Sequence, residues 1–210
     1  MLGFALLPTI WARADSPQAS GWFVTRSPHF ELYSQADAGN SRKTLATFEQ
    51  LRAFFNGNKV LPATARLATA SGLRIIIFPS AKEYSAFRLR PNADAYYASS
   101  EDREYIVMAG PQSQDLAIDA HEYTHSVLHA AGLKLPAWLD EGLSEFFSTV
   151  RITRVGCRVG GSLPNRIDAL THHKWLPMAQ LLTLQEAMPP FQTRDGMEIF
   201  YAESWLLPIC

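Results

Sequence analysis

The sequence predicts an α+β fold. Strand-like segments occupy much of the first half of the chain, helical periodicity dominates the second half, and no repeat or low-complexity tract separates two large domains. With 210 residues, 47% hydrophobic and 19% charged, the chain can bury the core of one domain. We expect a single domain over residues 20–210, with the sheet and a helix pair in 20–150 and a mostly helical part in 151–210.

Strands and helices mix in the first half of the chain. Alternation of apolar and polar residues predicts strands, and apolar residues three and four positions apart predict helices. The predicted elements are, in order, strand 27–33, helix 37–55, strand 73–78, a short helix after Pro79, and strands at 96–97 and 105–108.

Helical spacing continues through the second half. Gly132 ends a long helix, and Pro136 is suited to the first turn of the next one. Pro208 limits the last helix to about two turns. The predicted elements are helix 114–131, helix 136–150, short strands or loops between 156 and 164, and helices at 167–171, at 177–184 and from Met197.

Charge and composition exclude several classes of protein. The 19 Lys and Arg residues balance 20 Asp and Glu residues, so no basic excess is available for general nucleic-acid binding. No apolar run approaches the roughly 20 residues of a membrane-spanning helix, so we expect no integral membrane segment. Two distant cysteines, Cys157 and Cys210, indicate ordinary buried thiols rather than a disulfide framework.

The N-terminus favours export. Residues 1–11 are apolar, and Ala12-Arg13-Ala14 has the small-x-small pattern of a signal-peptidase site. No Lys or Arg precedes the apolar stretch, so a second interpretation is an N-terminal strand that packs on the core. We expect residues 1–14 to be the remnant of a signal peptide and the protein to be periplasmic or extracellular.

The long helix contains an H-E-x-x-H motif at His121, Glu122 and His125. Residues four apart on a helix differ in direction by about 40°, so both imidazoles can reach one metal ion. Glu122 lies at the border of that face, where it can contact a metal-bound water without binding the metal. A shuffled chain would contain the motif about one time in a hundred. Incidental histidines on an ordinary helix are the alternative.

A third metal ligand is predicted on the next helix. Glu141 follows His125 by sixteen residues, enough to end one helix, turn at Gly132 and return on an antiparallel partner to the level of the histidines. Two histidines and one carboxylate leave the fourth zinc position open, as in catalytic sites. Glu145, four residues on, can accept the remaining N–H of His121. A solvated helix carboxylate is the other interpretation of Glu145.

The remaining histidines do not extend the motif. The metzincin extension is absent, because positions 128 and 131 hold Leu and Ala. His129 lies two turns, about 12 Å, from His121 and cannot share its ion. We expect surface or hydrogen-bonded histidines at positions 29, 172 and 173.

These motifs resemble the gluzincin metallopeptidases. The stretch from Pro136 to Phe146 (PAWLDEGLSEF) is most similar to the second helix of bacterial "peptidase MA-like" proteins, and weaker likeness covers most of residues 20–210. The resemblance implies a small mixed sheet whose antiparallel edge strand packs on the metal-site helix. It also implies Zn²⁺ held by His121, His125 and Glu141, with Glu122 as general base.

The resemblance further implies an oxyanion donor and a peptide-binding strand. Tyr201 is in the segment where gluzincin aminopeptidases carry a tyrosine that donates to the oxyanion; a core aromatic is the alternative for it. The peptide substrate would add to an edge strand at 105–110, near Tyr105, Val107 and Ala109. Family members continue the helix that contains Tyr201, whereas this sequence reaches Pro208 within a turn or two. Compared with the family, we therefore expect the part at 151–210 to be truncated.

Two functions from different classes follow from this sequence. The first is a zinc-dependent peptidase that hydrolyses peptide bonds with a metal-activated water and Glu122 as base. The second is a binding or structural module that keeps the zinc fold without turnover. A chain with incidental histidines would instead carry no zinc and would not lose stability to a chelator.

Overall fold

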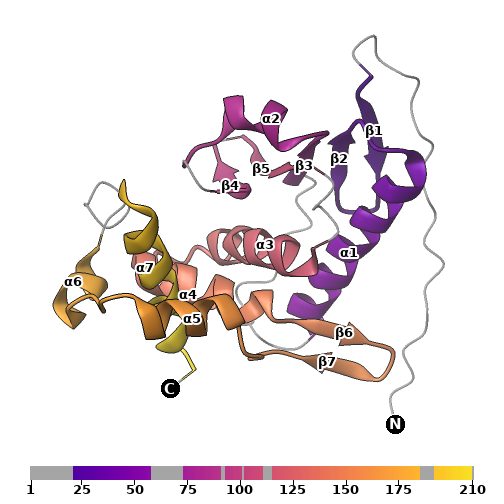
Figure 1. Cartoon of the computed structure of the whole chain (residues 1–210). Coiled ribbons are helices and arrows are strands. Elements are labelled where there is room, and N and C mark those ends of the chain that lie inside the picture. The colour runs from indigo at the N-terminus through magenta and orange to yellow at the C-terminus, as the bar shows by residue number, and fades with distance from the viewer. Residues whose placement is uncertain are drawn as a thin grey trace.

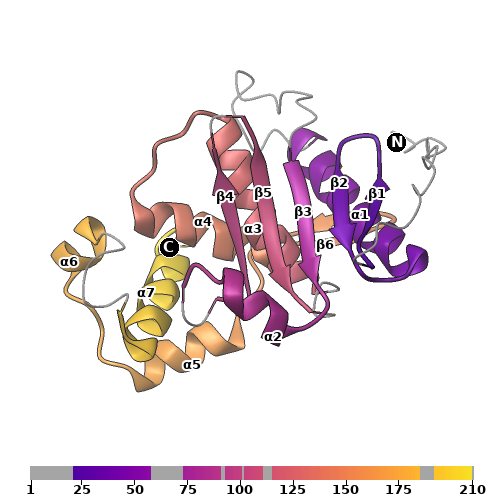
Figure 2. The same cartoon turned by 90° about the horizontal axis from the view of Figure 1, so that it is seen from above.

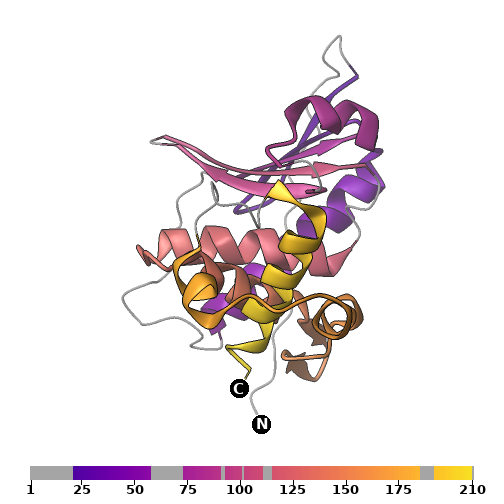
Figure 3. The same ribbon diagram turned by 60° about the vertical axis from the view of Figure 1, so that its left-hand side comes forward.

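The computed structural model describes residues 21–57, 73–90, 93–100, 102–110, 115–184 and 192–209. The predicted signal segment and Cys210 lie outside these residues. In the described part, a mixed sheet lies over helix α3, and the C-terminal helices gather beside and below α3 on the opposite side from the sheet (Figures 1 and 3). The α+β prediction is confirmed.

The sheet has five strands in the order β1-β2-β3-β5-β4. The inner pairs β2–β3 and β3–β5 are parallel, and the outer pairs β1–β2 and β5–β4 are antiparallel. Figure 2 shows this order over α1 and α3. The strands are β1 (Phe23–Arg26), β2 (Glu31–Ser34), β3 (Leu73–Phe78), β4 (Ala95–Ser99) and β5 (Glu104–Ala109).

The helices and a short hairpin surround this sheet. Contacts between helices join α3 to α4, α4 to α7 and α5 to α7. The elements are α1 (Ala38–Gly57), α2 (Ala81–Tyr84), the 3₁₀ helix η2 (Ser85–Phe87), α3 (Leu116–Ala130), α4 (Ala137–Ser148), β6 (Arg151–Thr153), β7 (Gly156–Arg158), α5 (Pro164–His172), α6 (Met178–Thr183) and α7 (Arg194–Leu206).

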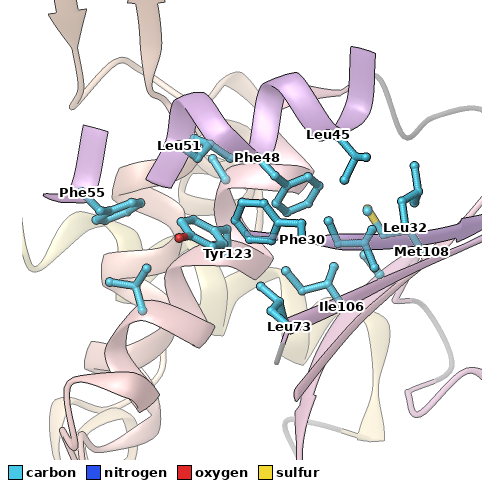
Figure 4. Close-up of a cluster of buried hydrophobic side chains, with 14 of the residues drawn as sticks. Phe30, Leu32, Leu45, Phe48, Leu51, Phe55, Leu73, Ile106, Met108 and Tyr123 are labelled. Carbon is cyan, nitrogen blue, oxygen red and sulfur yellow. The ribbon is translucent and has the colours of Figure 1, made fainter. Parts of the chain in front are cut away.

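The main core lies between the sheet, α1 and α3 (Figure 4). Alternation along β5 sends Ile106 and Met108 into this core, while Val107 and Ala109 join a smaller cluster with Tyr84 of α2 on the other face of the sheet. Tyr123 of α3 packs among aromatic rings of α1. The apolar face of α3 is thereby fixed against the sheet and α1, which sets the direction of its remaining side chains.

Helix α7 is held close to α4 at Gly142. A Cβ atom at position 142 would collide with the carbonyl oxygen of Ser204 and would lie 3.0 Å from Pro208 Cγ. Because glycine has no Cβ, the two helices can approach at this point. This contact fixes the part of α7 that carries Tyr201 relative to Glu141, the neighbour of Gly142.

Three sequence predictions about this framework are wrong. Residues 27–30 form the turn between β1 and β2, in which the Ser27 N–H donates to Phe30 O at 3.0 Å, so the strand begins only at Glu31. Cys157 is exposed on β7 rather than buried. The last helix has 13 residues rather than about two turns, because the Thr193 side chain caps its start by accepting from the Gly196 N–H.

None of the helices in the described residues combines the length and apolar character needed to span a membrane.

Candidate metal centre

Three side chains on α3 and α4 converge as the sequence spacing predicted. The Nε2 atoms of His121 and His125 lie 3.2 Å apart. Glu141 Oε2 lies 3.3 Å from His121 Nε2 and 3.5 Å from His125 Nε2. Gly132, with a φ of 69°, makes the turn that returns the chain along α3 and brings Glu141 to the level of the histidines. These three residues could hold a metal ion.

The spacing of the three donor atoms fits a small tetrahedral cation. Ligands bound at 2.0–2.1 Å in tetrahedral geometry are about 3.3–3.4 Å from one another. The three distances of 3.2, 3.3 and 3.5 Å lie around that value. No rearrangement of the helices is therefore needed for all three side chains to bind one ion.

The buried carboxylate of Glu141 requires a positive charge beside it. Its Oε2 atom is buried and faces the Nε2 atoms of His121 and His125 at 3.3 and 3.5 Å. Burial acts to raise the pKa of Glu141, but His125 and His121 hold it well below its usual value, so the carboxylate is ionised. A buried ionised oxygen is costly to leave unsatisfied. A cation between the three side chains would satisfy it.

The pKa values of His121 and His125 shift in the opposite direction to that of Glu141. Burial acts to lower the pKa of each imidazole, but the carboxylates outweigh it, so the pKa of His121 is raised and that of His125 is raised well above its usual value. In the metal-free protein, protons therefore supply positive charge at the position of the ion. A metal ion would displace these protons, because it binds neutral imidazole.

Glu145 lies behind His121. Its Oε1 atom is 3.5 Å from His121 Nδ1, and the side chain is buried rather than solvated. Arg166 on α5 donates to both oxygens of Glu145, at 2.6 and 2.9 Å. A fixed carboxylate at Nδ1 keeps the other ring nitrogen of His121 available to a metal.

His125 has its own partners, which the sequence did not reveal. Asp140 Oδ2 lies 3.1 Å from His125 Nδ1, and Ser144 Oγ lies 3.3 Å from the same atom. Both residues are on α4, one position before and three after Glu141, so the segment that supplies the third ligand also orients His125. Each histidine thus has a carboxylate at Nδ1 and points Nε2 at the site.

Glu122 is buried beside the two histidines. Burial raises its pKa, and His121 and His125 partly counteract that rise. The backbone of Tyr97, on β4, lies close enough to act in the same direction on this pKa. Glu122 is therefore a carboxylate of increased basicity between the metal position and the outermost strand of the sheet.

Tyr201 approaches the same site from α7. Its ring is 6.5 Å from the His121 ring in an edge-on arrangement, and its hydroxyl accepts a hydrogen bond of 2.9 Å from Arg90 Nη1. Arg90 Nη1 also lies 3.4 Å from Glu141 Oε1. The ring packs against Phe200 as well. Tyr201 thus combines the core contacts and the site position that the sequence offered as alternatives.

The prediction that residues 105–110 form an edge strand of the sheet is wrong. Residues 105–109 belong to β5, which pairs with β3 on one side and β4 on the other. The side chains of Tyr105, Val107 and Ala109 belong to the cluster around α2, on the sheet face opposite α3. The strand that lies at the end of the sheet and contacts α3 is β4.

Histidines outside the motif have other partners. His129 pairs with Glu104 at 2.9 Å, and His29 pairs with Glu49 at 2.7 Å. His173, for which the sequence predicted no site geometry, lies with Asp195 and Glu198 in a second group that could hold a metal ion. That group is partly exposed, and Glu198 already pairs with Arg194 at 2.8 Å.

The sequence matches no family model and no curated protein. The gluzincin resemblance therefore stays a prediction that rests on the motif residues.

Proposed function

We propose that this protein is a zinc-dependent peptidase of the gluzincin type. The observation that carries the proposal is the triangle of His121 Nε2, His125 Nε2 and Glu141 Oε2, with sides of 3.2 to 3.5 Å and a buried Glu122 beside it. Two imidazoles and one carboxylate at tetrahedral spacing are a zinc donor set that leaves one coordination position to another ligand. A free carboxylate next to such a site is what hydrolysis needs.

Zinc, when bound, would lower the pKa of a water and polarise a carbonyl group. Glu122 takes up the proton of the attacking water and passes it to the leaving amine. The raised pKa of Glu122 suits this task, because a base of higher pKa accepts the proton more readily. The carboxylate lies close to the backbone of Tyr97 on β4.

Tyr201 stabilises the oxyanion in this proposal. Because its oxygen accepts a hydrogen bond from Arg90, its own hydrogen remains available as a donor. Donors placed at a developing oxyanion contribute roughly 10²–10³-fold in rate. Arg90 fixes the phenol from one side while the ring packs against Phe200 on the other.

The peptide substrate would add to β4. This strand ends the sheet order, and in the described part of the chain no strand pairs with its outer side. A peptide bound there would be recognised by its backbone and would run past Glu122, which contacts Tyr97 of the same strand. We therefore propose β4, rather than β5, as the strand that pairs with the peptide substrate.

The test is the variant Glu122→Gln, beside Glu83→Gln, a change of an exposed carboxylate on α2. We expect the parent to cleave members of a diverse peptide library and Glu122→Gln to keep one zinc per chain while losing hydrolysis. Glu83→Gln should behave as the parent. Equal rates for parent and Glu122→Gln would reject the mechanism, and zinc without any cleavage by the parent would favour the inactive binding module.

A further inference from the structure

A polar cavity adjoins the proposed active site on the side of α7. Its volume is about 430 Å³, within the range of sites for small ligands. Tyr201, the proposed oxyanion donor, forms part of its wall. Charged side chains dominate the rest of the lining, which includes Arg88, Arg166, Arg194, Asp94 and Glu198.

The lining holds three guanidinium groups and two carboxylates, and each guanidinium group is paired with a carboxylate. Arg88 pairs with Asp94 at 3.3 Å and Arg194 with Glu198 at 2.8 Å; Asp94 and Arg194 are exposed by 61% and 78%. Each pair has one well-exposed partner, and ion pairs that water reaches contribute little, so an incoming carboxylate can compete for these guanidinium groups. Arg166 is only 17% exposed and donates two hydrogen bonds to Glu145, so that carboxylate already balances its charge.

Guanidinium groups favour a particular ligand. Their planar donors match the two oxygens of a carboxylate or a phosphate, and several of them around one cavity can share one anion. Among the described residues of its lining, only Met197 and Tyr201 are apolar or aromatic, too few to select a large hydrophobic group. A short acidic side chain or a terminal carboxylate fits both its guanidinium donors and its size.

The cavity also has a defined place along the substrate. Asp94 immediately precedes β4, and Glu122 contacts β4 at Tyr97, so the cavity lies beyond the start of the strand as seen from Glu122. A peptide that pairs with β4 in the commoner antiparallel sense runs from Ser99 towards Ala95. Its residues C-terminal to the scissile bond therefore reach the arginines.

We propose that this cavity is a subsite for a carboxylate on the C-terminal side of the scissile bond, supplied by an Asp or Glu side chain or by the substrate's own C-terminus. The inference rests on the proposed peptidase function and adds the class of substrate to it. Arg194 and Arg88 contact the carboxylate, while Arg166 stays paired with Glu145.

The experiment compares matched peptides that differ in one carboxylate. One arm sets Glu against Gln at each position after the cleaved bond, and a second arm sets a free C-terminus against its amide. Cleavage is measured as kcat/KM with the parent, and binding is measured as Kd by calorimetry with zinc-loaded Glu122→Gln. We expect the peptide with the carboxylate to be preferred about tenfold in both readouts, and the arm that shows the preference identifies the source.

Two variants of lining residues and one control show whether the carboxylate preference arises in this cavity. Arg194→Gln should reduce the preference to about twofold or less, because this exposed residue can change without disturbing the core. Arg154→Gln, in the turn between β6 and β7 away from the cavity, is the matched control and should retain the full preference. Arg88→Gln tests the second guanidinium group and should reduce the preference in the same way.

The outcomes separate this inference from the proposed function. Hydrolysis with no carboxylate preference, a preference for Lys or Arg, or an acidic preference only before the scissile bond would overturn the subsite and leave the peptidase intact. Tighter binding of the acidic peptides without any cleavage by the parent would support the subsite and refute the peptidase.

Discussion

The carboxylate of Glu145 accepts two hydrogen bonds from the guanidinium of Arg166, at 2.6 and 2.9 Å. The same carboxylate lies 3.5 Å from His121 Nδ1. Arg166 therefore holds in place the group that orients a proposed metal ligand, although it is 21 residues further along the chain. This relationship joins α5 to the metal centre and gives the C-terminal part of the chain a direct role in it.

The variant Glu145→Gln tests that role. An amide at this position cannot supply the charge that stabilises the zinc-bound imidazole, and removal of such an outer partner costs roughly 10–100-fold in metal affinity. We expect the zinc Kd, measured by competition with a chelator, to rise by about tenfold or more. Glu83→Gln serves as the control, and an unchanged Kd for Glu145→Gln would show that the contact does not act on the metal.

Gly142→Ala tests the close approach of α4 and α7. Alanine favours a helix interior by about 1 kcal/mol over glycine, so a harmless change would stabilise the protein. The collision with Ser204 O should instead lower the free energy of unfolding by about 1–3 kcal/mol and move Tyr201 away from the site. Gly57→Ala, at the end of α1 with open space around it, is the matched control for denaturant unfolding. Equal stability of Gly142→Ala and the parent would contradict the predicted contact.

Zinc binding should tighten as pH rises. In the metal-free protein the carboxylates hold the pKa of His121 and His125 above the ordinary 6.5, despite burial, so both imidazoles remain protonated to a higher pH. Zinc must displace these protons, which makes the Kd fall by up to about 100-fold per pH unit while both are bound. Titrations between about pH 5.5 and 8 measure this slope. A Kd that does not change over that range would exclude the histidines as ligands.

Tyr201→Phe removes one hydroxyl and keeps the ring that packs against Phe200. If the hydroxyl stabilises the oxyanion, kcat should fall by roughly 100-fold with little change in KM or zinc content. Steady-state kinetics on one good substrate measures the split. A variant with the parent's kcat would assign Tyr201 to packing alone.

Local patterns predicted the central part of the site. The four-residue spacing of His121 and His125 fixes their common direction on α3, and the length of the connection to Glu141 brings α4 back to the same level. Both relationships depend on helix geometry and chain length alone, which a sequence contains. The positions of α1 and β3 followed from periodicity in the same way.

Contacts between distant segments could not be predicted. Arg90 and Arg166 reach the site from a loop and from α5, and neither has a spacing that marks it. The place of β5 inside the sheet depends on β4 pairing with its far side, a choice that strand periodicity does not determine. Asp140 is the exception: it is adjacent to Glu141, and a carboxylate near a predicted histidine ligand could have indicated its role.

The most direct test of the account is the zinc content of the purified protein, measured for the parent and for His125→Ala under the same conditions. We predict about one zinc per chain in the parent and a small fraction of that in the variant. A parent that retains no zinc when zinc is supplied, or a variant that retains as much as the parent, would contradict the claim that His121, His125 and Glu141 bind a single ion.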